Sequence, residues 1–141
     1  MAKTTTSPFL QAVKNLDGTL TNANGTAKVT VFTAGANDSV LKSFNLASTD
    51  SAANNVQVFI NVGGAGTDRL ISTVPVPANS GNNGTVASVD VLRSALLPFA
   101  SYDAYGNRVL NLAAGTTIKI APLTTPASGK VIDAFGEGGD F

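Results

Sequence analysis

The stretch VQVFINV, residues 56–62, alternates side chains at every second position. One face of this stretch carries only branched aliphatic side chains, namely Val56, Val58, Ile60 and Val62. Alternation with a period of two is typical of a β-strand that buries one face against a core. We therefore expect a central strand here, in a sheet with one covered side.

Similar short apolar runs occur on both sides of this stretch, separated every 8–12 residues by Gly, Asn, Pro or Asp. This spacing predicts an all-β, antiparallel β-sandwich. Pro75 and Pro77 cannot donate hydrogen bonds to a neighbouring strand, so the strand at 69–76 is expected at a sheet edge. A helical turn competes only at 93–97. The remaining expected strands are 28–34, 40–46, 86–92, 108–112, 116–121 and 131–135.

The two ends of the chain are patterned differently from the middle. Residues 1–25 are polar and are interpreted as an N-terminal arm, with one short strand allowed at 10–16. The sandwich domain is assigned to residues 26–141. It ends in a glycine-rich segment, 136–141, which we expect to be a short flexible tail.

The composition excludes several kinds of chemistry. The 141 residues include no Cys, His or Trp, so catalysis by a Ser-His-Asp or Cys-His site is ruled out, and zinc lacks its usual ligands. Calcium needs only oxygen ligands, but segments 50–54 and 103–107 lack the dense acidic spacing of a calcium loop and are interpreted as turns. We expect no enzyme activity and no cofactor.

Charge also limits the partners of this protein. Nine basic residues balance nine acidic ones, and the basic residues are scattered singly, so a nucleic-acid surface is not expected. No apolar run is long enough for a membrane-spanning helix, and we expect no membrane partner. Low net charge permits dense packing of copies.

Two aromatic residues are predicted on faces that point away from the core. Phe32 and Phe59 fall opposite the aliphatic face of their strands. They indicate either a second covered surface, used for protein contacts, or the effect of barrel curvature or a local bulge.

Several segments occur in an order that resembles a known family. The run VFTAGAN at 31–37, the run VQVFINVGGAGTDRL at 56–70 and the ending AFGEGGDF at 134–141 carry the likeness, which spans about residues 28–141. Together they resemble the capsid cement (decoration) proteins of tailed bacteriophages, including the jelly-roll cement protein of podoviruses. The resemblance implies a jelly-roll sandwich on the outer capsid surface of the virion, made in the host cytoplasm.

The expected function is therefore structural. The protein would bridge subunits of the major capsid protein and associate with itself as dimers or trimers. The alternative is a carbohydrate- or receptor-binding β-sandwich of a head or tail fibre. The residues expected to contact other proteins are Thr4, Thr5, Thr6, Phe9, Phe32, Phe59, Asp140 and Phe141.

Overall fold

A computed structural model gives the structure of the chain, and it describes residues 9–92 and 97–141. The described residues form two antiparallel sheets. Sheet A contains, in order, β1 (Ala12–Thr21), β10 (Val131–Asp140), β3 (Ser39–Ser48), β8 (Arg108–Leu112) and β7 (Ser101–Tyr102), with β6 (Val89–Asp90) paired to β3. Sheet B contains β2 (Val29–Thr33), β9 (Thr117–Pro122), β4 (Asn54–Asn61) and β5 (Arg69–Val76). A 3₁₀ turn, η1 (Val62–Gly64), follows β4.

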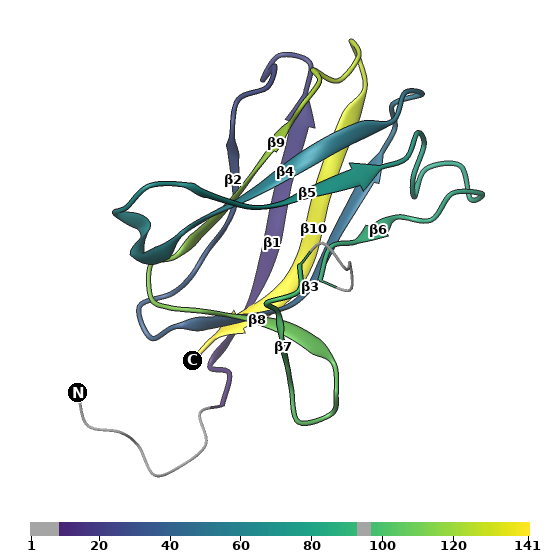
Figure 1. Cartoon of the computed structure of the whole chain (residues 1–141). Coiled ribbons are helices and arrows are strands. Elements are labelled where there is room, and N and C mark those ends of the chain that lie inside the picture. Colours follow the sequence, from purple (N-terminus) through teal and green to yellow (C-terminus); the bar gives the residue numbers. More distant parts are fainter. Residues whose placement is uncertain (1–8, 93–96) are drawn as a thin grey trace.

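The chain crosses repeatedly between the two sheets, although β4 and β5 both belong to sheet B and β6, β7 and β8 all belong to sheet A. The first strand, β1, pairs with the last, β10, and the second strand, β2, pairs with β9. β3 then pairs with β10, and β4 with β9. Apart from the short β6 and β7, this nested order is the jelly-roll arrangement. Figure 1 shows β4 and β5 crossing in front of β1, β10 and β3. The predicted β-sandwich is confirmed.

The core lies between the sheets and is built by the expected alternation. Each long strand places every second side chain inward, where water is excluded, and each large aliphatic side chain buried in this way contributes about 1.5–3 kcal/mol. The largest fully buried side chains include Leu16, Leu20, Phe44, Leu46, Val56, Val58, Ile118, Ile120 and Ile132.

A β-bulge in β2 changes the direction of Phe32. The pairing with β9 shifts register between Thr30 and Phe32, so Val31 is an extra residue. A bulge of this kind lets two successive side chains point to the same side. Both Val31 and Phe32 are consequently buried. The outward orientation predicted for Phe32 is wrong, and the local bulge is the correct explanation.

The N-terminal region contributes more to the sandwich than expected. The strand foreseen at 10–16 is β1, which extends from Ala12 to Thr21 and pairs with β10 along its whole length. Leu16 and Leu20 of β1 are fully buried. Residues 12–21 are therefore part of the sandwich and not of an arm, and residues 1–8 lie outside the described residues.

The glycine-rich C-terminal segment is also part of the sandwich. β10 runs without interruption to Asp140 and lies between β1 and β3. The prediction of a flexible tail at 136–141 is wrong. A Cβ atom on Gly136 would lie 2.1 Å from the carbonyl oxygen of Ser43, and one on Gly138 would lie 2.1 Å from that of Val40. These glycines are needed because β3 approaches so closely.

Most other strand predictions hold, some with the predicted bounds and some with shifted ones. β5 covers exactly the expected residues 69–76 and pairs only with β4 among the described residues, so it is an edge strand. The strand expected at 86–92 is reduced to β6. Most of the helical turn expected at 93–97 lies outside the described residues. No helix of the described part is long and apolar enough to cross a membrane.

Candidate interaction surface

A groove of about 350 Å³ lies on the outer face of sheet A, between the chain ends and the β7–β8 hairpin. Its floor is apolar, because Val40 and Val109 point outward from β3 and β8 and are nonetheless buried. Its other lining residues are Leu10, Lys42, Tyr102, Asp103, Ala104, Tyr105, Asn111 and Phe141. We call this surface the tyrosine groove.

The two tyrosines of the chain are the most prominent groups of the tyrosine groove. Tyr102 is 69% exposed and Tyr105 is 90% exposed. The hairpin that carries them is fixed by Asp103, whose carboxylate accepts hydrogen bonds from the backbone N–H groups of Asn107 and Tyr105, each at 2.9 Å. These bonds, led by the one from Asn107, lower the pKa of Asp103. The hairpin thus presents exposed aromatic rings on an ordered turn.

The chain ends are joined to each other beside the tyrosine groove. The backbone N–H of Gln11 donates to the carbonyl oxygen of Asp140 at 2.8 Å, and that of Phe141 donates to the carbonyl of Asp38 at 3.3 Å. The Asp140 carboxylate accepts a 2.5 Å hydrogen bond from Ser39 and lies 3.4 Å from Lys14 Nζ. These contacts hold the half-buried Phe141 at the groove.

A second exposed aromatic group lies on the same face of sheet A. Phe135 in β10 points outward and is 57% exposed. Asp133 and Glu137, two residues away in either direction, share its face, and Asp17 lies directly opposite it on β1. All three carboxylate residues are exposed. Phe135 with these three residues forms what we call the acidic Phe135 patch.

The outer face of sheet B carries a network of charged groups. Asp68 accepts hydrogen bonds from Asn61 Nδ2 at 3.0 Å and from Lys119 at 3.0 Å, and Lys28 Nζ lies 3.2 Å from it. The bond from Asn61, followed by that from Lys119, lowers the pKa of Asp68 to about 2. Lys28 also lies 4.3 Å from the centre of the Phe59 ring. The half-buried Phe59 therefore faces outward, as predicted, and is partly covered by a cation.

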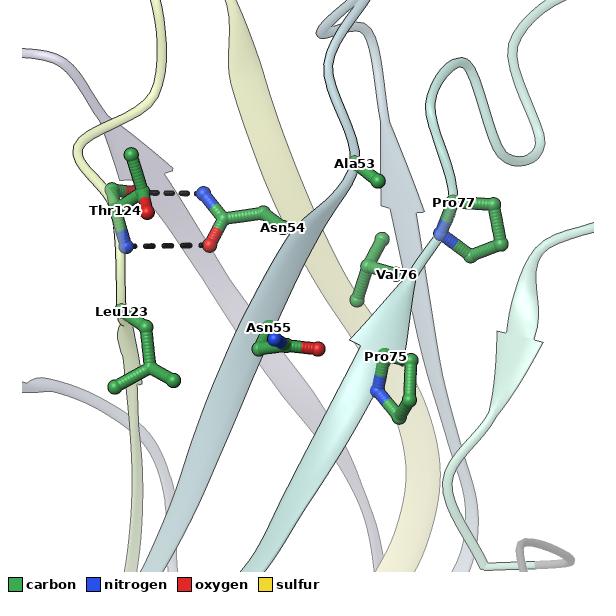
Figure 2. A pocket seen from close by; sticks show the side chains of 8 residues that line it. All are labelled: Ala53, Asn54, Asn55, Pro75, Val76, Pro77, Leu123 and Thr124. Atoms are coloured by element: carbon green, nitrogen blue, oxygen red, sulfur yellow. Dashed lines mark hydrogen bonds between the residues drawn. The ribbon is translucent and has the colours of Figure 1, made fainter.

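A pocket of about 330 Å³ opens at the end of sheet B where β4 begins (Figure 2). Asn54 fixes one side, because its amide donates to the carbonyl of Thr124 at 2.6 Å and accepts from the N–H of Thr124 at 3.3 Å. The pocket has no charged lining residue and is mainly apolar. Its other lining residues are Ala53, Asn55, Pro75, Val76, Pro77 and Leu123. We call it the proline pocket.

The eight residues expected to contact other proteins are not one cluster. Thr4, Thr5 and Thr6 lie outside the described residues. Phe9 is exposed next to Leu10 of the tyrosine groove, and Phe141 lines that groove. Asp140 ties the chain ends together. Phe32 is buried, and Phe59 lies on the opposite sheet.

The segments considered for calcium are turns in the structure. Asp50 is buried and accepts hydrogen bonds from the N–H groups of Ala127 at 2.9 Å and Ala52 at 3.1 Å. The bond from Ala127 is the main cause of its lowered pKa. Asp103 shapes the hairpin as described above. Within residues 9–92 and 97–141, no group of three or more Asp or Glu side chains is placed to hold a metal ion.

Sequence reasoning missed Phe135 and the two tyrosines as surface groups. For Phe135 a signal was present in the sequence. In an alternating strand Phe135 shares a face with Asp133, whereas Ile132 and Ala134 fall on the other face. The tyrosines gave no such signal, because their exposure depends on a turn. Comparison of the chain with protein-family models, with curated proteins and with solved structures finds no match.

Proposed function

We propose that this protein is a structural component of a bacteriophage virion, which decorates the outer capsid surface and cements it by bridging subunits of the major capsid protein. The jelly-roll fold supports this proposal, since viral capsid and lectin domains use it. A fold alone does not define a function, so the proposal depends on the surface.

The tyrosine groove is the observation that carries the proposal. Exposed aromatic groups on an ordered surface are typical of protein contacts, and tyrosine is enriched where contact energy concentrates. Leu10, which lines the groove, lies just before the start of β1. We expect the N-terminal arm and this groove to engage a neighbouring protein together.

Binding alone would provide the stabilisation. A subunit that binds the assembled shell, and not its separated parts, stabilises the shell by mass action. Contact with two capsid subunits at once adds avidity, so each single contact can be weak. The proposed mechanism therefore needs no catalytic group.

The test measures retention of the protein on purified phage heads. Deletion of residues 1–9 removes no residue of β1, so the truncated protein should unfold at the same denaturant concentration as the full chain while its retention falls. Tyr105→Ser should also reduce retention, because Tyr105 is almost fully exposed in the groove. Equal retention of both variants and the unmodified protein, or a copy number of only a few per virion, would refute the proposal.

A second candidate function is supported by the same two tyrosines. Carbohydrate-binding surfaces combine aromatic rings with a few polar groups, and Lys42 and Asn111 line the tyrosine groove beside the rings. A glycan array probed with the isolated protein and with Tyr105→Ser tests this candidate. Specific binding lost in the variant would favour a carbohydrate- or receptor-binding sandwich of a head or tail fibre.

A further inference from the structure

The outer faces of the two sheets carry complementary features on opposite sides of the molecule. Sheet A presents the acidic Phe135 patch, in which a large aromatic side chain protrudes from a polar face. Sheet B presents the proline pocket, a small apolar recess without charged lining. A protruding apolar group and a recess on the same chain can join two copies, because each copy offers one of each.

The chemistry of the recess suits an aromatic side chain. Pro75, Pro77 and Leu123 supply apolar surface, and the volume of about 330 Å³ is at the small end of the range of about 300–1,000 Å³ for ligand pockets. Leu123 is 51% exposed in the isolated chain, so covering it would remove apolar area from water. A phenyl ring that enters the pocket would likewise remove its own apolar area from water.

The charges distinguish between the ways in which copies could meet. A two-fold contact of the Phe135 patch with itself would bring two sets of three carboxylates together, and such like-charge contacts are unfavourable. The outer face of sheet B instead carries Lys28 and Lys119 against Asp68 alone, so this cluster is positive overall. Lys119 pairs with Phe59, four residues along β4 from Asn55 of the pocket, so the cluster lies roughly 13 Å from the recess. An acidic patch seated at the recess therefore meets a distant positive cluster on this face and not a like charge.

We propose that copies of this protein associate head to tail, with Phe135 of one copy inserted into the proline pocket of the next. The contact uses two different surfaces, so it builds a ring or an open row and not a two-fold dimer. It differs from the tyrosine groove, and it stands whether or not the copies also bind a capsid.

Two variants that each remove one half of the contact provide the test. Phe135→Thr removes the protruding ring and keeps a residue that favours β-strands. Leu123→Glu places a carboxylate in the pocket, where it repels the acidic patch. For each variant alone, the affinity of self-association should fall at least about tenfold relative to the unmodified protein. An equimolar mixture should form one-to-one dimers and nothing larger, because it contains one intact ring surface and one intact pocket per pair.

Sedimentation velocity at protein concentrations up to about 1 mM detects a contact with a millimolar Kd or tighter. Phe99→Thr and Phe99→Glu are matched controls, since the Phe99 side chain is 50% exposed and lies outside both surfaces. Both controls should associate as the unmodified protein does. Asn55→Trp fills the pocket without adding charge and should behave as Leu123→Glu does.

Three results would overturn the proposal: a monomeric unmodified protein at every concentration, unchanged association of Phe135→Thr or of both pocket variants alone, or an equimolar mixture that stays monomeric. Circular dichroism of each variant establishes that it is folded. Retention on phage heads is measured separately, so a failure of head-to-tail association is distinguishable from a failure of capsid binding.

Discussion

Ser39 Oγ donates a hydrogen bond of 2.5 Å to Asp140 Oδ1, joining the start of β3 to the end of β10. The same carboxylate oxygen accepts a bond from the N–H of Gly35 at 3.3 Å, and Lys14 approaches the other oxygen. A Cβ atom on Gly35 would lie 2.6 Å from the Asp140 carboxyl carbon. One side chain thus ties β1, β3 and the β2–β3 loop to the last strand.

Asp140→Ala should lower the free energy of unfolding by about 1–3 kcal/mol, because it leaves the buried Ser39 hydroxyl without its acceptor and leaves the Gly35 N–H with Ser39 Oγ alone. Urea unfolding measures the change. Asp133→Ala is the control: Asp133 is exposed and accepts one hydrogen bond, from Thr19. The free energy of unfolding of Asp133→Ala should fall by no more than about 0.5 kcal/mol. Equal losses in the two variants would contradict the role assigned to Asp140.

Asp68 should make stability depend on acid pH. Its pKa is lowered from 3.8 to about 2 by Asn61 and Lys119, so the folded state binds its proton less readily than the unfolded chain. The stabilisation is complete above the unfolded pKa and is lost as pH falls through about 2. Asp68→Asn should unfold at lower urea concentration at neutral pH and show a smaller loss between about pH 5 and pH 2. An unchanged acid profile would contradict this assignment.

The sequence indicated the sandwich because most core strands alternate cleanly, as residues 56–62 do. The prediction of which side chains face inward failed where one extra residue shifts the alternation along a strand. The extra residue Val31 turns Phe32 inward. The alternating pattern of the sequence does not reveal where a bulge of this kind occurs. The same limitation applies to the tyrosine groove, which depends on how the β7–β8 hairpin lies against the chain ends.

The C-terminal error has a different cause. Glycine is depleted in strands and common in flexible segments, so propensity favours a tail at 136–141. In the fold, β10 is held by β1 on one side and β3 on the other, and the approach of β3 leaves no space for a side chain at Gly136 or Gly138. Tertiary packing therefore decides against propensity, and the sequence alone contains no information on how closely β3 lies.

Pro75 protects the open edge of β5. The N–H of Leu123 donates to the carbonyl of Asn55, so Asn55 directs its backbone groups to β9. Pro75 lies opposite Asn55 in the antiparallel pair, and its ring nitrogen consequently faces the open edge. A Thr at this position would restore a backbone donor there.

Pro75→Thr should therefore increase association through strand addition at β5. We expect this gain in the Phe135→Thr background, in which the head-to-tail contact is absent and Pro75 no longer acts through the proline pocket. Sedimentation velocity measures the association, and amide hydrogen exchange should show new protection at Thr73 on the same edge. If the double variant remains monomeric, features other than Pro75 prevent strand addition at this edge.

Gly136→Ala tests whether the glycines of β10 are required by space. The added Cβ would meet the Ser43 carbonyl oxygen at 2.1 Å, which is backbone and cannot rotate away. We expect a loss of about 3 kcal/mol or more in the free energy of unfolding, because β3 and β10 must separate to accommodate it.

Gly84→Ala is the control. Gly84 has a φ of +73° with nothing within 4 Å of the added atom, so its cost is about 1–2 kcal/mol of backbone strain alone. If Gly136→Ala is too unstable for urea titration, its soluble yield relative to Gly84→Ala gives the same ranking. A smaller loss at Gly136 than at Gly84 would show that β10 can move away from β3, and that the glycines are not there for close approach.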